Sequence, residues 1–275
     1  MGLLRLRDRG VEIKTPDQIA LMRRAGRIVG ETLQLCRDRI QPGMSADDLD
    51  GLAEGYIRDH GAVPSFMGYH GFPKTLCVSV NDEVVHGIPG PRRFESGDVV
   101  SIDCGAIVEG WHGDAAITVA LGDVSAETKQ LLAACEEALW RGIAAARIGG
   151  HVTDIAHGVE TSVRRAGDYG IVEDYVGHGI GSSMHMAPNV PNVGAPGQGP
   201  RLVRGIALAV EPMITLGGIE TDLLQDDWTV VTRDGSVAAH FEHTFTLTRT
   251  GTWVLTALDG GSARLTDLGV RYGGD

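Results

Sequence analysis

Two aspartates stand in neighbouring apolar runs near the middle of the chain. Asp103 lies in VVSIDCGAIV (99–108) and Asp114 in WHGDAAITVA (111–120), with Glu109-Gly110 between the runs. If Glu109-Gly110 is a two-residue hairpin loop, position 103 faces 116, and position 114 lies on the same face, two residues along the strand. Two carboxylates side by side in an apolar sheet repel each other and lose hydration unless a cation lies between them. This stretch alone fits a metal site and a pair of solvated turn aspartates equally well.

Three histidines stand in or next to glycine-containing stretches. His178 lies between two glycines in VGHGIGSSMH, which ends at His185, and His86 precedes Gly-Ile-Pro. The segment 176–200 is rich in Gly, Pro and Asn, so we expect a loop in which the backbone approaches closely and the His178 imidazole is accessible. A flexible surface loop with two incidental histidines is the alternative. His86 occupies a loop position of the kind that commonly presents functional side chains.

Two glutamates complete the set of possible ligands. Glu211 ends the apolar run ALAV, where a buried carboxylate needs a cation or a proton. Glu242 alternates with Phe241 and His243 in a predicted strand, so it faces either solvent or the site. Four carboxylates and one imidazole are ligands that suit two divalent ions such as Mn, Fe, Co or Zn, rather than a soft thiolate-bound metal.

The elements that carry these residues follow a repeated order. Thr15-Pro16-Asp17-Gln18 predicts a capped helix start, Ser45 predicts a second, and amphipathic stretches at 125–147 and 153–166 predict two more helices. Two helices therefore precede each strand region, which suggests duplicated halves. We expect an arm at 1–12, one catalytic domain at 13–258 and a loosely held Gly-rich tail at 259–275.

The composition narrows the functional classes. The net charge of −12 argues against a nucleic-acid partner held through phosphates. The four cysteines lack CxxC spacing and are interpreted as reduced thiols of a cytoplasmic protein. No signal peptide and no apolar run of membrane-spanning length is visible.

Five stretches, in order, resemble the motifs of the methionine aminopeptidases of the short type I kind. They are GYHGFPKTLCVSVNDEVVHGIP (68–89), SIDCG with WHGDAAIT, GHGIGSSMH, AVEPM and FEHT. The resemblance covers roughly residues 13–255. The spacing from His178 to Glu211 leaves no room for the helical insert of type II enzymes.

The resemblance implies an α+β "pita-bread" fold with two pseudo-symmetric halves and a dinuclear metal site in the cleft between them. Asp103 would chelate one of two divalent ions (Co, Mn, Fe or Zn), Asp114 and Glu242 would bridge both, and His178 and Glu211 would complete the other. A water or hydroxide held between the metals would be the nucleophile. Three residues would be catalytic: Glu211 as proton acceptor, His185 at the scissile carbonyl oxygen, and His86 at the scissile amide.

The resemblance also implies a pocket for the methionine side chain. Tyr69, Phe72, Cys77 and Trp228 would line it, and His70 would lie beside it. Phe66 and Met184 occupy adjacent positions where Cys and Phe are expected in some relatives. Ordinary core packing is the alternative for these aromatic residues. The implied function is removal of the initiator methionine from nascent peptides with small second residues, by a cytoplasmic monomer that has at most a transient contact with the ribosome.

Three alternatives compete with this interpretation. Aminopeptidase P and prolidase share a similar ligand set, but they normally carry a sizeable N-terminal domain, and Asp103 comes too early for one. A catalytically dead binding protein, or a metal-free creatinase-like enzyme, would be expected to have lost metal ligands, and this chain keeps all five.

Overall fold

The computed structural model describes residues 10–274, in which helix pairs alternate with groups of strands. The helices are α1 (Pro16–Arg39), α2 (Ala46–Asp59), α3 (Ala126–Ala145), α4 (Val152–Ala166), α5 (Ser262–Asp267) and the short 3-10 helix η1 (Tyr69–Gly71). The strands before α3 are β1 (Val63–Pro64), β2 (Leu76–Val80), β3 (Glu83–Val85), β4 (Val99–Val108) and β5 (Trp111–Ala120). The strands after α4 are β6 (Gly170–Ile171), β7 (Gly177–Gly179), β8 (Met186–Val190), β9 (Ala207–Val210), β10 (Met213–Thr215), β11 (Thr221–Leu223), β12 (Val230–Thr232), β13 (Ala238–His240), β14 (Glu242–Leu247) and β15 (Thr252–Val254).

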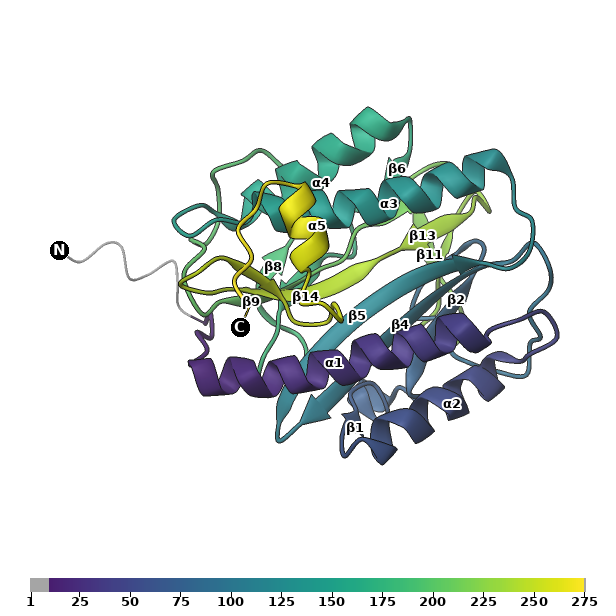
Figure 1. The fold of residues 1–275 in the computed structure, drawn as a ribbon. Helices are drawn as coiled ribbons and strands as arrows, with labels where there is room; N and C mark the ends of the chain where they lie inside the picture. Colours follow the sequence, from purple (N-terminus) through teal and green to yellow (C-terminus); the bar gives the residue numbers. More distant parts are fainter. Residues whose placement is uncertain (1–9, 275) are drawn as a thin grey trace.

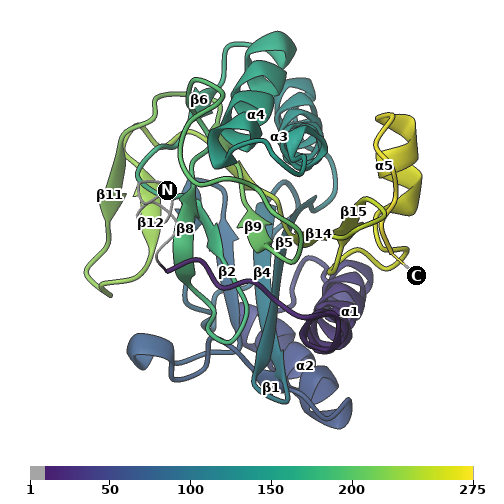
Figure 2. The ribbon, with the colours of Figure 1, turned by 90° about the vertical axis from the view of Figure 1, so that its left-hand side faces the viewer.

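A nine-stranded sheet joins the two parts of the chain. Its main order is β1-β4-β5-β14-β9-β7-β8, with β2 on β4 and β15 on β14, and each of these pairings is antiparallel. Helices α1 and α2 pack below the sheet in Figure 1, and α3 and α4 pack above. Figure 2 shows the small β11-β12 sheet on the side away from α1. The arrangement confirms the expected α+β fold with two similar halves.

Each half has a hydrophobic core of its own. One core includes Val29 of α1, Leu49 of α2 and Ile102 of β4. The other includes Leu139 of α3, Val159 of α4 and Phe245 of β14. The sheet continues across the seam between the halves through the pairing of β5 with β14.

The helix starts follow the predicted capping residues. The Thr15 side chain accepts a hydrogen bond from the Gln18 amide, and the Gln18 side chain accepts one from the Thr15 amide. Ser45 and Asp48 form the same reciprocal pair at the start of α2. These pairs satisfy amide groups that a helix leaves without partners, so they fix where α1 and α2 begin.

The central hairpin has the predicted register. Val108 pairs with Trp111 and Asp103 with Ala116, so the loop contains only Glu109 and Gly110. Both loop residues have positive φ, 51° and 84°, as a tight hairpin turn of type I′ requires. The register places Asp103 and Asp114 on one face as diagonal neighbours, as expected.

Two expectations from the sequence were wrong. The segment 176–200 is not a continuous loop, because β7 carries His178 in the sheet and β8 follows it, and the imidazole is buried, with the residue 5% exposed. The segment after Leu258 is not loosely held, because it forms α5 and buries Leu265 completely. The described part of the expected arm, residues 10–12, precedes Ile13, which pairs with Ile206, and residues 1–9 lie outside the described region.

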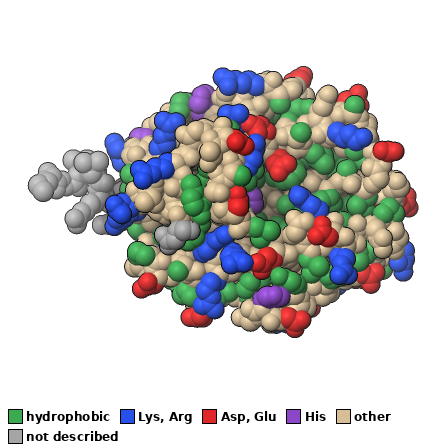
Figure 3. Space-filling view, viewed as in Figure 1, with side chains coloured by type: hydrophobic (Ala, Val, Ile, Leu, Met, Phe, Trp, Pro, Cys, Tyr) green, Lys and Arg blue, Asp and Glu red, His purple; other side chains and the backbone are tan. Residues whose placement is uncertain are grey.

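The membrane-spanning potential of the helices, the surface charge and the state of the cysteines complete the description of the fold. In residues 10–274, none of the helices combines the length and the apolar character that crossing a bilayer requires. On the face drawn in Figure 3, acidic and basic side chains are interspersed over most of the surface. All four cysteines are buried and free, which agrees with the interpretation as reduced thiols.

Candidate metal centre and adjoining pocket

A row of three residues across neighbouring strands forms the floor of the site. Ala116 of β5 pairs with Asp103 of β4 on one side and with Glu242 of β14 on the other. Two strand spacings separate the outer backbones, so the Asp103 and Glu242 Cα atoms stand about 10 Å apart. Because Ala116 contributes only a methyl group, the space between the two carboxylates stays open.

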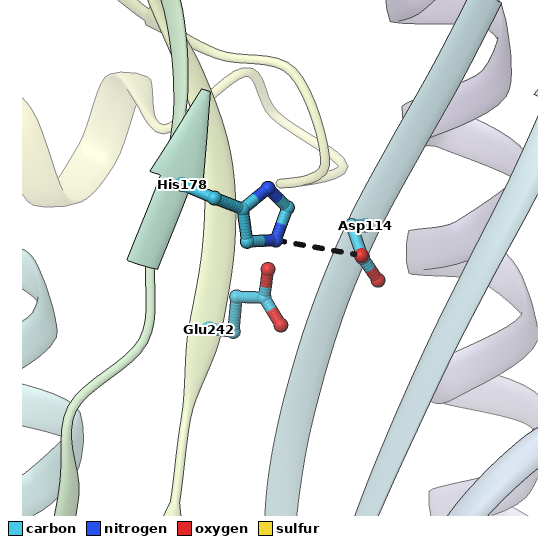
Figure 4. Close-up of side chains that lie close together, drawn as sticks. All are labelled: Asp114, His178 and Glu242. Carbon is cyan, nitrogen blue, oxygen red and sulfur yellow. Dashed lines mark ion pairs between the residues drawn. The ribbon is translucent and has the colours of Figure 1, made fainter. Parts of the chain in front are cut away.

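Asp114, Glu242 and His178 converge from three strands. One ligand atom from each lies within 4.8 Å of the others, and all three residues are buried. Figure 4 shows Asp114 on β5 opposite His178 on β7, with Glu242 of β14 beside them. The Thr244 hydroxyl holds the Asp114 backbone by donating to its carbonyl at 2.8 Å and accepting from its amide at 3.2 Å. The cluster therefore lies at the seam between the halves.

Asp114 and Glu242 are buried, Asp103 and Glu211 are partly buried, and none of the four carboxylates is paired with a cation from the described residues. In residues 10–274, no Lys or Arg forms an ion pair with Asp103, Asp114, Glu211 or Glu242. Burial raises the pKa of Asp103 to about 7, and burial together with the Asp103 and Glu211 charges raises the pKa of Asp114 well above its usual range. Burial likewise raises the pKa values of Glu211 and Glu242.

Three oxygen atoms of this cluster have no hydrogen-bond partner within the described range, residues 10–274. They are Oδ1 of Asp103, Oδ1 of Asp114 and Oε1 of Glu242. Buried acceptors of this kind need either protons or cations. Four carboxylates with one imidazole make a donor set that fits divalent cations, so the chain's residues match the implied metal site.

His178 is in the right state to be a metal ligand. Its Nδ1 lies 2.9 Å from the Gly179 carbonyl oxygen, so Nδ1 carries the proton and Nε2 presents a lone pair. Nε2 lies 3.5 Å from Oε1 of Glu211 and 4.0 Å from Oδ2 of Asp114. Burial lowers the pKa of His178 to about 3, which keeps the ring neutral.

Two more histidines face the cluster. The His185 ring centroid lies 4.2 Å from that of His178, and its Nδ1 lies 2.9 Å from the Tyr69 hydroxyl. When Tyr69 donates to Nδ1, His185 Nε2 carries the proton and is a donor. His86 has a positive φ of 62°, and the ring of this half-buried residue lies edge-on to Tyr175 and Trp228. Burial lowers its pKa to about 4.

An apolar pocket of about 130 Å³ adjoins the carboxylates. Phe66, Phe72, Cys77 and Met184 form its buried wall, and Tyr69, Trp228 and Ile88 pack against them. The lining comprises thirteen of the fourteen residues predicted for the site, namely Phe66, Tyr69, Phe72, Cys77, His86, Asp103, Asp114, His178, Met184, His185, Glu211, Trp228 and Glu242. His70 is exposed, touches Tyr69 edge-on and does not line the pocket.

The sequence analysis missed four residues near the site. Ile88, inside the HGIP motif, packs on the apolar wall, and Tyr175 packs on His86. Thr244 follows Glu242 at the next site-facing position of β14, so strand alternation could have identified it. His240 is 2% exposed, and its Nε2 lies 4.0 Å from Oε2 of Glu242. Burial lowers the pKa of His240 to about 3.

The chain is similar in sequence to proteins of one metallopeptidase family. Residues 20–249 match the profile of metallopeptidase family M24. The chain is 49% identical to methionine aminopeptidase of Clostridium acetobutylicum over 89% of its length and 98% of the relative's. It is 49% identical to methionine aminopeptidase 1 of Mycobacterium tuberculosis, over 92% of this chain and 98% of that one.

Solved structures are similar over most of the chain. The crystal structure of methionine aminopeptidase from Thermotoga maritima has a TM-score of 0.88 and 40% identity, and covers 90% of this chain and 99% of that one. Prolidase from Pyrococcus furiosus shares the fold at a TM-score of 0.72 and 21% identity. This chain covers 65% of its length, and the alignment spans 89% of this chain.

Proposed function

Because this chain belongs to the methionine aminopeptidases of metallopeptidase family M24, we propose that it removes the N-terminal methionine from peptides by metal-dependent hydrolysis. The observation that carries the proposal is that a set of possible metal ligands adjoins an apolar pocket. A largely buried cluster of four carboxylates and His178 lines the same pocket as a set of apolar side chains. The cluster supplies the ligands for metal-dependent hydrolysis, and the pocket is suited to an unbranched apolar side chain.

Charge balance favours two divalent ions. The four carboxylates carry four negative charges when ionised, and two divalent cations would neutralise them. Neutralisation matters because desolvation raises the free energy of an uncompensated charge in this site. Asp103 would bind one ion, and His178 and Glu211 would bind the other. Asp114 and Glu242 would each bind both ions. Oxygen and imidazole donors suit Mn, Fe, Co or Zn.

The side chains around the cluster divide the acid–base work. Bound divalent cations supply Lewis acidity, which lowers the pKa of a water molecule to near neutrality. Glu211, whose pKa burial raises, accepts the proton from the attacking water. His185 donates from Nε2 to the scissile carbonyl oxygen as negative charge develops there, and Tyr69 sets its tautomer. His86 contacts the scissile amide and assists its departure.

Phe66 and Met184 shape the methionine pocket. Both are buried in its apolar wall, against which Trp228 packs. We propose that they set how tightly the pocket holds methionine, while Tyr69, Phe72, Cys77 and Trp228 supply the rest of its surface. Small second residues would be preferred, because the space beyond the scissile bond is expected to be narrow.

We propose further that the enzyme acts as a monomer in the cytoplasm on nascent chains, with at most a transient ribosome contact. The interspersed charge in Figure 3 supports the absence of a broad basic docking face on that side.

Methionine release tests the function. Metal-stripped protein is incubated with Met-Gly and Met-Ala peptides after Mn, Co, Fe or Zn is added back, and Leu-first peptides and peptides with a bulky second residue serve as controls. We expect metal-dependent release of free methionine only from Met peptides with small second residues. Metal-dependent cleavage of X-Pro peptides instead would assign the chain to the aminopeptidase P class. No release by folded protein with any metal would indicate a binding protein.

A further inference from the structure

His240 is a buried imidazole aimed at a proposed metal ligand. It is the last residue of β13, one residue before β14 begins, and only 2% of the residue is exposed. Its Nε2 has no hydrogen-bond partner among residues 10–274, and the nearest carboxylate oxygen is Oε2 of Glu242 at 4.0 Å. That separation is too long for a hydrogen bond. A buried donor and a buried carboxylate thus face each other across a small gap.

The backbone of His240 is fixed from the other half of the molecule. Its amide donates to the Thr118 hydroxyl at 3.0 Å, and that hydroxyl donates to the His240 carbonyl oxygen at 2.6 Å. Thr118 lies on β5 and is also 2.9 Å from the Ser101 hydroxyl on β4. His240 is therefore held by the same two strands that carry Asp114 and Asp103, whereas the Glu242 side chain has rotatable bonds that can close the gap.

The choice of tautomer follows from the neighbour. A neutral imidazole carries its proton on one nitrogen only. With the proton on Nε2, His240 offers a donor to the carboxylate, whereas the other tautomer would place the Nε2 lone pair against the lone pairs of Oε2. His240 lies outside the group of ligand atoms within 4.8 Å of one another, which contains Asp114, His178 and Glu242. The geometry therefore fits a hydrogen-bond donor rather than a sixth metal ligand.

We propose that His240 is a positioning residue, which donates its Nε2 proton to Glu242 and orients that carboxylate for metal binding. The inference rests on the proposed function only in taking Glu242 as a metal ligand. A carboxylate that bridges two ions needs a defined orientation, and a neutral donor behind it restricts the rotation about its last bonds. Partners of this kind typically contribute 10- to 100-fold to metal affinity.

Metal affinity tests the proposal independently of peptide cleavage. The dissociation constant for Mn is measured by calorimetry on metal-stripped wild type, His240→Leu and His240→Gln. We expect the Leu variant to bind Mn about 10- to 100-fold more weakly, and the Gln variant, whose amide retains a donor, to stay within a few-fold of wild type. In peptide assays at saturating metal, kcat should fall in the Leu variant, whereas KM should change little because the apolar pocket is intact.

His243→Gln is the matched control. His243 is the neighbour of Glu242 on the same strand, but its Nδ1 lies 2.8 Å from the Thr256 hydroxyl on the outer side of the sheet. We expect its Mn dissociation constant to equal that of wild type, even if the melting temperature falls. Wild-type affinity in folded His240→Leu would overturn the proposal, and so would an equal loss in the Leu and Gln variants.

The tautomer provides a second measurement that needs no variant. Nitrogen-15 NMR of the imidazoles in the Zn-loaded enzyme should show the His240 proton on Nε2. A proton on Nδ1, or a Zn-bound Nε2, would overturn the proposal even if His240→Leu failed to fold. If the wild type binds Mn but releases no methionine, the proposed function is contradicted. The proposal for His240 is not affected by that result.

Discussion

Gly105→Ala would test the fit between the sheet and the pocket wall. Gly105 pairs with Asp114, so its missing side chain would point to the site face. A Cβ placed there would stand 2.7 Å from Ser65 Cβ and 2.8 Å from Phe66 Cε1, both closer than real contacts allow. Phe66 therefore occupies space that Gly105 leaves free, and the glycine is required for room rather than for backbone conformation.

The expected cost follows from two opposing effects. Overpacking a well-packed region costs about 1–3 kcal/mol, and replacing glycine by alanine returns about 0.4–1 kcal/mol by restricting the unfolded chain. The midpoints of these two ranges leave a net loss of about 1.3 kcal/mol, which corresponds to a fall of roughly 3–5 °C in melting temperature for a domain of this size. The displaced Phe66 ring should also raise KM for Met-Ala peptides.

A double-mutant cycle identifies the contact. In a Phe66→Leu background the clash with the ring is removed while the Ser65 contact stays, so the cost of Gly105→Ala should fall by at least about 0.5 kcal/mol. Gly51→Ala is the control, because a Cβ on that helical glycine meets nothing within 4 Å and should raise the melting temperature. The reasoning is refuted if Gly105→Ala costs the same in both backgrounds, or if it stabilises the protein as Gly51→Ala does.

Three other outcomes are expected. Metal-free protein should lose stability as pH rises from about 4 to about 7, because Asp103, whose pKa burial raises to about 7, must ionise in the folded state. Thermal melts should show this slope, and Asp103→Asn should reduce it. Thr244→Val should cost about 1–3 kcal/mol and lower kcat, because the hydroxyl supports Asp114, whereas Thr246→Val, whose hydroxyl donates to Ile206, should cost stability alone. An equal loss of kcat in both would contradict this. Leu265→Ala should cost about 2–5 kcal/mol in urea unfolding, since the side chain is fully buried, and an unchanged midpoint would show that α5 does not support the domain.

Local patterns in the sequence predicted the elements that local interactions determine. The capping pairs at Thr15 and Ser45 define the starts of two helices, and Glu109-Gly110 defines the hairpin register. That register alone places Asp103 and Asp114 on one face, because side chains alternate strictly along a strand. The fold class and the ligand set followed from the order of the motifs.

Other features depend on contacts between distant segments. Gly177 and Gly179 indicate a loop by composition, yet their missing side chains let β7 pack against the Ala209 and Ala187 carbonyls, where a Cβ would clash. The side to which Glu242 points could not be chosen from alternation, since it depends on which strand pairs with β14. His240 gave no sequence pattern of its own, because its role arises from burial beside Glu242.

The narrow seam between the halves has a consequence for folding kinetics. β5 and β14 share two residue pairs, whereas each half closes around its own core, and Asp103 and Glu242 are about half the chain apart in sequence. Long-range contacts form late because loop closure must precede them. Each half should therefore fold first, and the repulsion of Asp103 and Asp114 against Glu211 and Glu242 should be met only when the halves join. Added metal would then accelerate the last phase of refolding and leave the earlier phases unchanged.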